Sequence, residues 1–171
     1  RSSVAQLWQA LQEAAEPHLQ AHQLRWQCNL AHPEQLGVQC NQDVLLGALM
    51  NLLHNSAQSA AAPVAIKVHA YVREEMLRLV ITDNGEGMGP ELLEQAQESF
   101  FTRKSAGTGL GLMVVQAVVQ AHQGRFVLRS KQGRGTSALV ELPLLADFSA
   151  STEQTITSSA PSPALMKGDY L

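Results

Sequence analysis

The feature that most limits the possible folds of this chain is a pair of alternating apolar and polar segments joined by a short turn. Residues 64–72 (VAIKVHAYV) and 76–82 (MLRLVIT) alternate with the period of two that a half-buried strand requires. A second pair, 125–131 (RFVLRSK) and 136–144 (TSALVELPL), is joined by the glycine-containing turn QGRG. The two pairs predict two antiparallel hairpins.

Helical segments lie before and between these strand pairs. Apolar spacing predicts helices at residues 4–15, 43–61, 91–96 and 109–124, with further strands at 24–30 and 36–40. Asp43 is a good N-cap for the second helix, and Gly124 is expected to stop the last one. Strand pairs with helices inserted between them predict an α+β fold, a two-layer α/β sandwich with a mixed, mostly antiparallel sheet and helices on one face.

Composition narrows the class of protein. The chain has 171 residues, of which 45% are apolar and 16% charged, as in a soluble globular domain. The formal net charge is -3 and no basic stripe is visible, so nucleic acid is not an expected partner. No run of eighteen apolar residues occurs, so no membrane contact by this chain is expected either. After residue 146 the sequence turns to Ser, Thr, Ala and Pro. We therefore expect one domain at 1–146 and a disordered tail or linker remnant at 147–171.

The predicted helix at 43–61 carries a stripe of small and polar residues. Asp43, Gly47, Asn51, Asn55 and Ser59 recur every four positions on an otherwise apolar helix. A carboxamide oxygen is a hard neutral ligand that suits Mg²⁺ bound to phosphate. Alternatively, the two asparagines are core amides that bond neighbouring backbone groups.

The segment DNGEGMG at 83–89 follows a predicted strand and contains three glycines, which allow the backbone to approach a flat ligand. The carboxylate of Asp83 can accept a hydrogen bond from an exocyclic amine such as that of adenine. A calcium loop is excluded, because Gly85 and Gly87 offer no side-chain oxygen and Met88 stands where glycine is required. A plain turn remains the alternative.

A second glycine segment, GTGLGL at 107–112, runs directly into a helix, where backbone N–H groups can cradle phosphates. It is neither a dinucleotide-binding fingerprint nor a P-loop, because no strand directly precedes it and no G-K-[ST] occurs. Arg103 and Lys104, just before it, either pair with a triphosphate or form a solvated charge pair. Phe100 and Phe101 are expected to anchor a lid on the core.

Together these segments resemble the catalytic ATP-binding domain of sensor histidine kinases, in the superfamily that also contains gyrase, Hsp90 and MutL ATPases. NLLHNSAQSA at 51–60 is similar to the N box, DNGEGMG to the G1 box, ESFFTRK at 98–104 to the F box of the nitrogen-sensor-like kinases, and GTGLGL to the G2 box. The resemblance covers about residues 1–145, and four motifs in the right order are more specific than any one.

The resemblance implies a site for Mg·ATP. Asn55 would coordinate Mg²⁺, Asn51 would contact phosphate or bound water, Lys104 would reach the phosphates and Asp83 would bond the adenine amino group. The implied nucleotide-binding set also contains Gln58, Ser59, Gly85, Gly87, Met88, Phe101, Thr102, Arg103, Gly107, Thr108, Gly109, Leu110, Gly111, Leu112 and Thr136. Two positions depart from the family pattern: Arg103 stands where the subfamily usually has Thr, and Gln58 replaces a basic residue that some members carry.

The hydrolases of this superfamily carry a Glu four residues before the metal-binding asparagine, and this chain has Asn51 there. A neutral amide is no general base, so water attack is expected to be slow. The resemblance therefore implies a protein-histidine kinase that binds ATP and Mg²⁺ and donates the γ-phosphate to a histidine in a two-component system. The alternatives are an ATPase clamp of the MutL or Hsp90 type, a serine kinase of the anti-sigma type and a non-catalytic nucleotide-binding module.

The expected partners follow from the same resemblance. No H-E-x-x-x-P segment occurs in the sequence, so the phosphoacceptor histidine is expected on a separate dimerisation domain. A response regulator would accept the phosphate next. The chain by itself is expected to be a cytoplasmic monomer.

Overall fold

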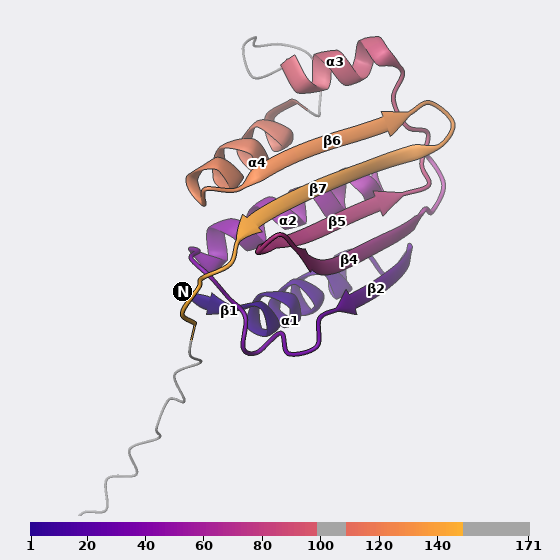
Figure 1. The fold of residues 1–171 in the computed structure, drawn as a ribbon. Coiled ribbons are helices and arrows are strands. Elements are labelled where there is room, and N and C mark those ends of the chain that lie inside the picture. Colours follow the sequence, from indigo (N-terminus) through magenta and orange to yellow (C-terminus); the bar gives the residue numbers. More distant parts are fainter. Residues whose placement is uncertain (99–108, 149–171) are drawn as a thin grey trace, which may run out of the picture.

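The two predicted hairpins supply four strands of a five-stranded sheet. The structure is a computed structural model that describes residues 1–98 and 109–148. The strands of the sheet are β2 (Gln23–Asn29), β4 (Ala65–Arg73), β5 (Met76–Asp83), β6 (Arg125–Lys131) and β7 (Gly135–Pro143). Their order is β2-β4-β5-β7-β6, so the two hairpins meet where β5 pairs with β7 (Figure 1).

The sheet is mixed, as predicted. β2 runs parallel to β4, with Trp26 opposite Val68, whereas the other three pairings are antiparallel. A parallel pair needs a long crossover connection. Here the chain between β2 and β4 includes helix α2 (Gln42–Ala57), which packs against β5 and β4.

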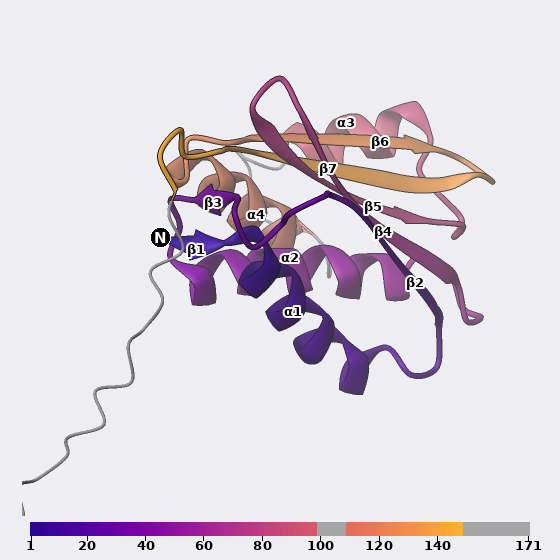
Figure 2. The same cartoon turned by 60° about the horizontal axis from the view of Figure 1, so that its bottom comes forward.

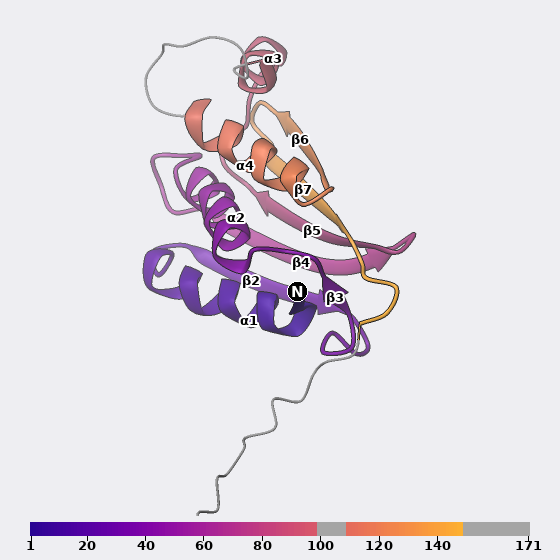
Figure 3. The same cartoon turned by 90° about the vertical axis from the view of Figure 1, so that its left-hand side faces the viewer.

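The helices cover one face of this sheet and leave the other without a helix. Figure 3 shows α1 (Val4–Ala15), α2 and α4 (Gly109–Ala121) side by side on the same face. Helix α3 (Pro90–Glu98) lies beyond β6, and a short 3-10 turn, η1 (Glu16–His18), follows α1. The predicted two-layer α/β sandwich is confirmed. None of the helices in the described ranges has the length and apolar character that crossing a membrane requires.

The core lies between the two layers. Alternation on β4 turns Ile66, Val68 and Ala70 toward the helices, and each is at most 1% exposed. Trp8 of α1 packs edge-on against Trp26 of β2, with ring centroids 5.4 Å apart. Burial of such large apolar side chains is the main stabilising contribution to a fold of this size.

The predicted strand at 36–40 is shorter than expected and lies outside the main sheet. β3 (Gly37–Val38) pairs antiparallel with β1 (Ser2–Ser3), as Figure 2 shows beside the N-terminus. The end of the described chain packs here too: Leu145 N–H donates to Gly37 O, and the Phe148 ring fills the space where a Cβ on Gly37 would stand. The tail predicted from residue 147 lies, from 149 on, outside the described residues.

Several helix ends differ from the sequence-based expectation, and those of α2 and α4 have a clear physical reason. The N-cap of α2 is Asn41, whose side chain accepts a hydrogen bond from Val44 N at 3.3 Å, and Asp43 lies in the first turn instead. The same helix ends at Ala57, earlier than expected. Past α4 it is Gln123 that adopts the left-handed conformation (φ 58°). Gly124 is needed for a different reason, since a Cβ there would clash with Glu141 O.

Candidate functional site

Asp83, the last residue of β5, is the centre of the candidate site. Its side chain is buried, with 4% of the residue exposed. Oδ1 accepts hydrogen bonds from Gly85 N at 2.9 Å and from Thr136 N at 3.2 Å. Hydrogen bonds to the ionised form make a buried carboxylate tolerable. One oxygen atom thus ties the end of β5, the loop that follows it and the start of β7 together.

Ser130 of β6 joins the loop after β5 to the start of β7 at the same end of the sheet, and it was not predicted. Its Oγ donates to Gly135 O at 3.0 Å and accepts from Met88 N at 2.8 Å. Because its single proton goes to Gly135, the Thr136 hydroxyl is the donor in the 2.8 Å contact between the two side chains. A serine on the core-facing side of a strand, in register with Thr136, is the sequence signal that could have found it.

The loop after Asp83 needs glycine at two points. Gly87 has φ 66°, and a Cβ there would clash with Lys131 O. A Cβ on Gly85 would clash with the Ser59 hydroxyl, just beyond the end of α2. Glu86 N donates to Ser59 O at 2.9 Å. The loop is therefore pressed against both the β6–β7 hairpin and the C-terminal end of α2.

Helix α2 contributes the amides. Asn51 and Asn55 are half-buried, and no hydrogen bond joins either side-chain amide to another residue of 1–98 or 109–148. This geometry does not match the alternative of core amides satisfied by neighbouring backbone. The stripe predicted on this helix is only partly at the site, because Asp43 and Gly47 are exposed near the opposite end.

The start of α4 lies beside these amides. A Cβ built on Gly111 would stand 3.9 Å from Asn55 Nδ2. Gly109 and Leu110 form the first turn of this helix, and Leu112 is buried in the core. The N-terminus of a helix presents unpaired N–H groups and a partial positive charge, so the helix end next to Asn55 favours an anion.

The structure brings together many, though not all, of the residues predicted for the site. Gln58 is exposed and is the C-cap of α2, and Met88 is half-buried against the core. The predicted residues that lie outside the described ranges are Phe101, Thr102, Arg103, Lys104, Gly107 and Thr108. The other predicted members lie where β5, α2, α4 and the β6–β7 hairpin meet at one end of the molecule (Figure 1).

A metal ion at this site would depend on a small set of ligands. Within the described residues, no group of three His, Cys, Asp or Glu side chains could hold an ion. The Asn55 amide, with no hydrogen-bond partner among those residues, fits an ion that takes its other ligands from phosphate and water.

Comparison with known proteins identifies the family. The model of the family described as histidine kinase-, DNA gyrase B- and HSP90-like ATPase matches residues 40–146. The chain belongs to this family. It is 49% identical over 139 residues to the sensor protein kinase FleS of Pseudomonas aeruginosa, covering 81% of this chain and 34% of FleS. It is 34% identical over 122 residues to the sensor histidine kinase ZraS of Escherichia coli K12, covering 71% of this chain and 26% of ZraS.

A solved structure gives the same result. The mycobacterial sensor histidine kinase MprB superposes with a TM-score of 0.67 at 25% identity, covering 83% of this chain and 95% of that one. The ATPase-family domain described above is therefore a histidine-kinase-type catalytic domain in both sequence and fold. It spans only 26% to 34% of the length of ZraS and FleS.

Proposed function

We propose that this ATPase-family domain binds Mg·ATP and donates the γ-phosphate to a histidine on a separate dimerisation domain, as part of a two-component system. The observation that carries the proposal is the fixed Asp83 carboxylate. It lies at the same end of the sheet as Asn55 and the start of α4, so one ligand with a base and a phosphate chain would reach both groups.

Adenine would bind at Asp83. A buried carboxylate with Oδ1 already bonded to Gly85 N and Thr136 N is oriented before the ligand arrives. In our proposal it accepts the hydrogen bond of the adenine amino group, and Gly87 and Met88 line the base. Thr136 and Ser130 keep the carboxylate in place from the other hairpin.

The phosphates would bind between α2 and α4. Asn55 would ligate Mg²⁺, Asn51 would contact phosphate or bound water, and backbone N–H groups of residues 109–112 would receive the phosphate oxygens. When bound, Mg²⁺ neutralises charge that develops on the phosphates. Lys104 is proposed as the catalytic cation, and the further proposed ligand residues are Gln58, Ser59, Gly85, Phe101, Thr102, Arg103, Gly107 and Thr108.

The identity of residue 51 favours phosphotransfer over hydrolysis. An amide nitrogen is only a donor and an amide oxygen is barely basic, so Asn51 cannot take a proton from water. The domain would then act by positioning the γ-phosphate and neutralising its charge, and an imidazole from another domain would supply the nucleophile.

The partners of the whole protein are part of this proposal. Because the chain spans 26% to 34% of the length of ZraS and FleS, a histidine-bearing dimerisation domain would come from the rest of the protein. A response regulator would receive the phosphate, on the cytoplasmic side of the cell. The isolated domain would be a monomer.

The test mixes this chain with a separately purified, histidine-bearing dimerisation domain of a sensor kinase and γ-labelled ATP. We expect label on that domain that is stable in alkali and lost in acid, and none when the acceptor histidine is replaced. Asn55→Ala should abolish the transfer, whereas Asn29→Ala, a matched change on the far edge strand, should leave it intact. Release of free phosphate by this chain alone at a comparable rate, or acid-stable label on serine, would overturn the proposal.

A further inference from the structure

On the face of the sheet that carries no helix, apolar and charged side chains lie in separate rows. Strand pairing places side chains of β2, β4, β5, β7 and β6 in rows that run across this face. The middle row is apolar where Val80, Leu139 and Val127 lie side by side, each half-buried. It continues over β4 with His69, whose Nε2 is buried without a hydrogen-bond partner in the described part of the chain.

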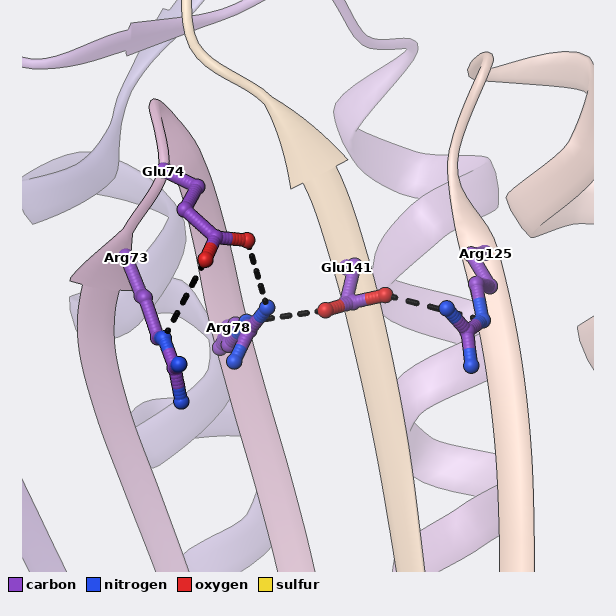
Figure 4. A network of polar contacts seen from close by, with 5 residues as sticks. All are labelled: Arg73, Glu74, Arg78, Arg125 and Glu141. Carbon is purple, nitrogen blue, oxygen red and sulfur yellow. Dashed lines mark ion pairs between the residues drawn. The ribbon is translucent and has the colours of Figure 1, made fainter.

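In the row on one side of this apolar strip, the charged side chains pair with one another. Figure 4 shows Glu141 of β7 between Arg78 of β5 and Arg125 of β6, in front of the strands and away from the helices. Arg78 Nε lies 2.8 Å from Glu141 Oε1, and Arg125 Nε lies 3.8 Å from Oε2. Glu141 is only 6% exposed, so its charge is used within the sheet.

The row on the other side contains three cations. Arg25 of β2 lies directly opposite Lys67 of β4, and Arg129 lies opposite Ser137 on the far side of the sheet. All three cations are exposed. No acidic side chain in residues 1–98 or 109–148 forms an ion pair with any of them. Like charges placed opposite each other across a strand pair destabilise the sheet, so a partner that brings carboxylates would relieve them.

The same row ends in a hollow. A shallow, open hollow of about 260 Å³ is lined by the cations Arg129, Lys131 and Arg134, by Thr82 and Ser137, and by Ser130, Gly135 and Thr136 of the candidate site. The hydroxyls of Thr82 and Ser137 lie 3.3 Å apart. The chain has a formal net charge of -3, yet folding gathers these cations, scattered in the sequence, on one face. No basic stripe is visible in the sequence because each strand contributes only one or two of them.

We propose that this open face, defined by the apolar row of Val80, Leu139 and Val127 and the cationic row of Arg25, Lys67 and Arg129, docks an acidic protein surface. Aliphatic side chains of the partner cover the apolar row, and its carboxylates pair with the cationic row. A strip of half-buried aliphatic residues beside a charged rim is the arrangement of a protein interface. The same face carries the paired rings of His69 and Tyr71, 4.9 Å apart, but three adjacent aliphatic side chains form its middle, which favours a protein partner over nucleic-acid bases that stack on aromatic rings. Each of the three is half-buried, so none projects far enough to insert into lipid.

The test uses the whole chain and a synthetic helical peptide rich in Glu with interspersed Leu, followed by NMR chemical-shift mapping. We expect shifts on the open face of β2, β4, β5, β7 and β6, and affinity that falls as NaCl rises from about 0.05 M to about 0.5 M. The double variant Arg25→Glu/Lys67→Glu should weaken binding by about tenfold. It replaces one like-charge pair by another, so folding should change little.

The control of equal charge is Arg1→Glu/Arg73→Glu, which changes exposed cations away from these rows and also breaks one exposed ion pair, Arg73 with Glu74 at 3.5 Å. It should alter the peptide affinity by no more than about twofold. Val80→Thr/Val127→Thr keeps side-chain shape and strand propensity while adding hydroxyls to the apolar row. It should weaken the Leu-containing peptide about threefold and leave an all-Glu peptide unchanged.

Several results would overturn the proposal. One is an equal loss of affinity in the control and the Arg25/Lys67 variant. Another is tighter binding of phosphatidylglycerol vesicles or single-stranded oligothymidylate than of the acidic peptide, since either would assign the face to a different class of partner. A concentration-dependent dimer whose interface maps to these strands would assign it to a second copy of the chain. ATP affinity, measured on the same variants, should stay unchanged, so failure here leaves the nucleotide site untouched.

Discussion

At the residue scale, Asp83 has two tasks that different substitutions separate. Its Oδ1 satisfies Gly85 N and Thr136 N, which are structural bonds. In the proposed complex the carboxylate also accepts a hydrogen bond from adenine. Asparagine keeps an oxygen that can serve the backbone groups, but its NH₂ then faces the amino group of the base, donor against donor.

We therefore predict that Asp83→Asn folds with nearly unchanged stability and binds ATP roughly 10- to 100-fold more weakly. Asp83→Ala should lose the same affinity and also about 2 kcal/mol of unfolding free energy, because two N–H groups lose their acceptor. Calorimetric titration and urea unfolding measure the two quantities. If Asp83→Asn bound ATP as tightly as the unmodified chain, the adenine assignment would be wrong.

His69 is the second residue with a distinct expected behaviour. Burial lowers the pKa of its imidazole below the ordinary 6.5, and the neighbouring Lys67 charge lowers it further. The folded state thus prefers neutral His69, whereas the unfolded chain takes up the proton. The contribution to stability is complete above pH 6.5 and is lost as pH falls from 6.5 toward the folded-state pKa.

The NMR titration of the His69 ring should give a pKa below 6.5, and Lys67→Gln should raise it without restoring 6.5, because burial remains. Thermal unfolding of His69→Gln should show a smaller loss of stability on acidification than the unmodified chain. A midpoint at or above 6.5 for the unmodified chain would contradict the assigned environment.

At the element scale, the sequence predicted strands better than helix ends. Alternation and a short turn were enough for both hairpins, because a period of two fixes which side chains face the core. The alternation of apolar and polar residues does not specify which strand a strand pairs with, so the pairing of β3 with β1 could not be predicted. Asp43 and Asn41 are both good capping residues two positions apart, and only the backbone of residue 41, extended at ψ 107°, decides between them.

Because Asn41 and not Asp43 caps α2, changes at the two residues should destabilise the protein to different extents. Asn41→Ala removes the bond to Val44 N and should cost about 1 kcal/mol of unfolding free energy. Asp43→Asn leaves the cap intact and removes only a favourable charge near the helix N-terminus, which should cost about 0.5 kcal/mol or less. Denaturant unfolding of the two variants ranks them, and the reverse order would restore Asp43 as the cap.

At the scale of the whole molecule, the motif residues of the candidate site could be predicted from the sequence. The residues that hold them in position could not. Asp83, Asn55 and Gly111 stand in recognisable segments, so their type and order sufficed. Ser130 stands in an ordinary strand sequence, and only the pairing of β6 with β7 brings its hydroxyl to Met88 N and Thr136. The cationic row on the open face was missed for the same reason: its members are neighbours through strand pairing alone.

Because the proposed site joins segments from α2 to β7, nucleotide binding should stabilise the whole fold and not one loop. Mg·ATP at about 100 times its dissociation constant should add about 2.7 kcal/mol to the unfolding free energy and raise Tm by roughly 10 °C. Asn55→Ala should lose most of that rise, as should the unmodified chain with the metal chelated. Asn41→Ala, an asparagine change on the same helix, should start from a lower Tm yet gain as many degrees. Scanning calorimetry compares them directly, and an undiminished rise in Asn55→Ala would remove Asn55 from the metal site.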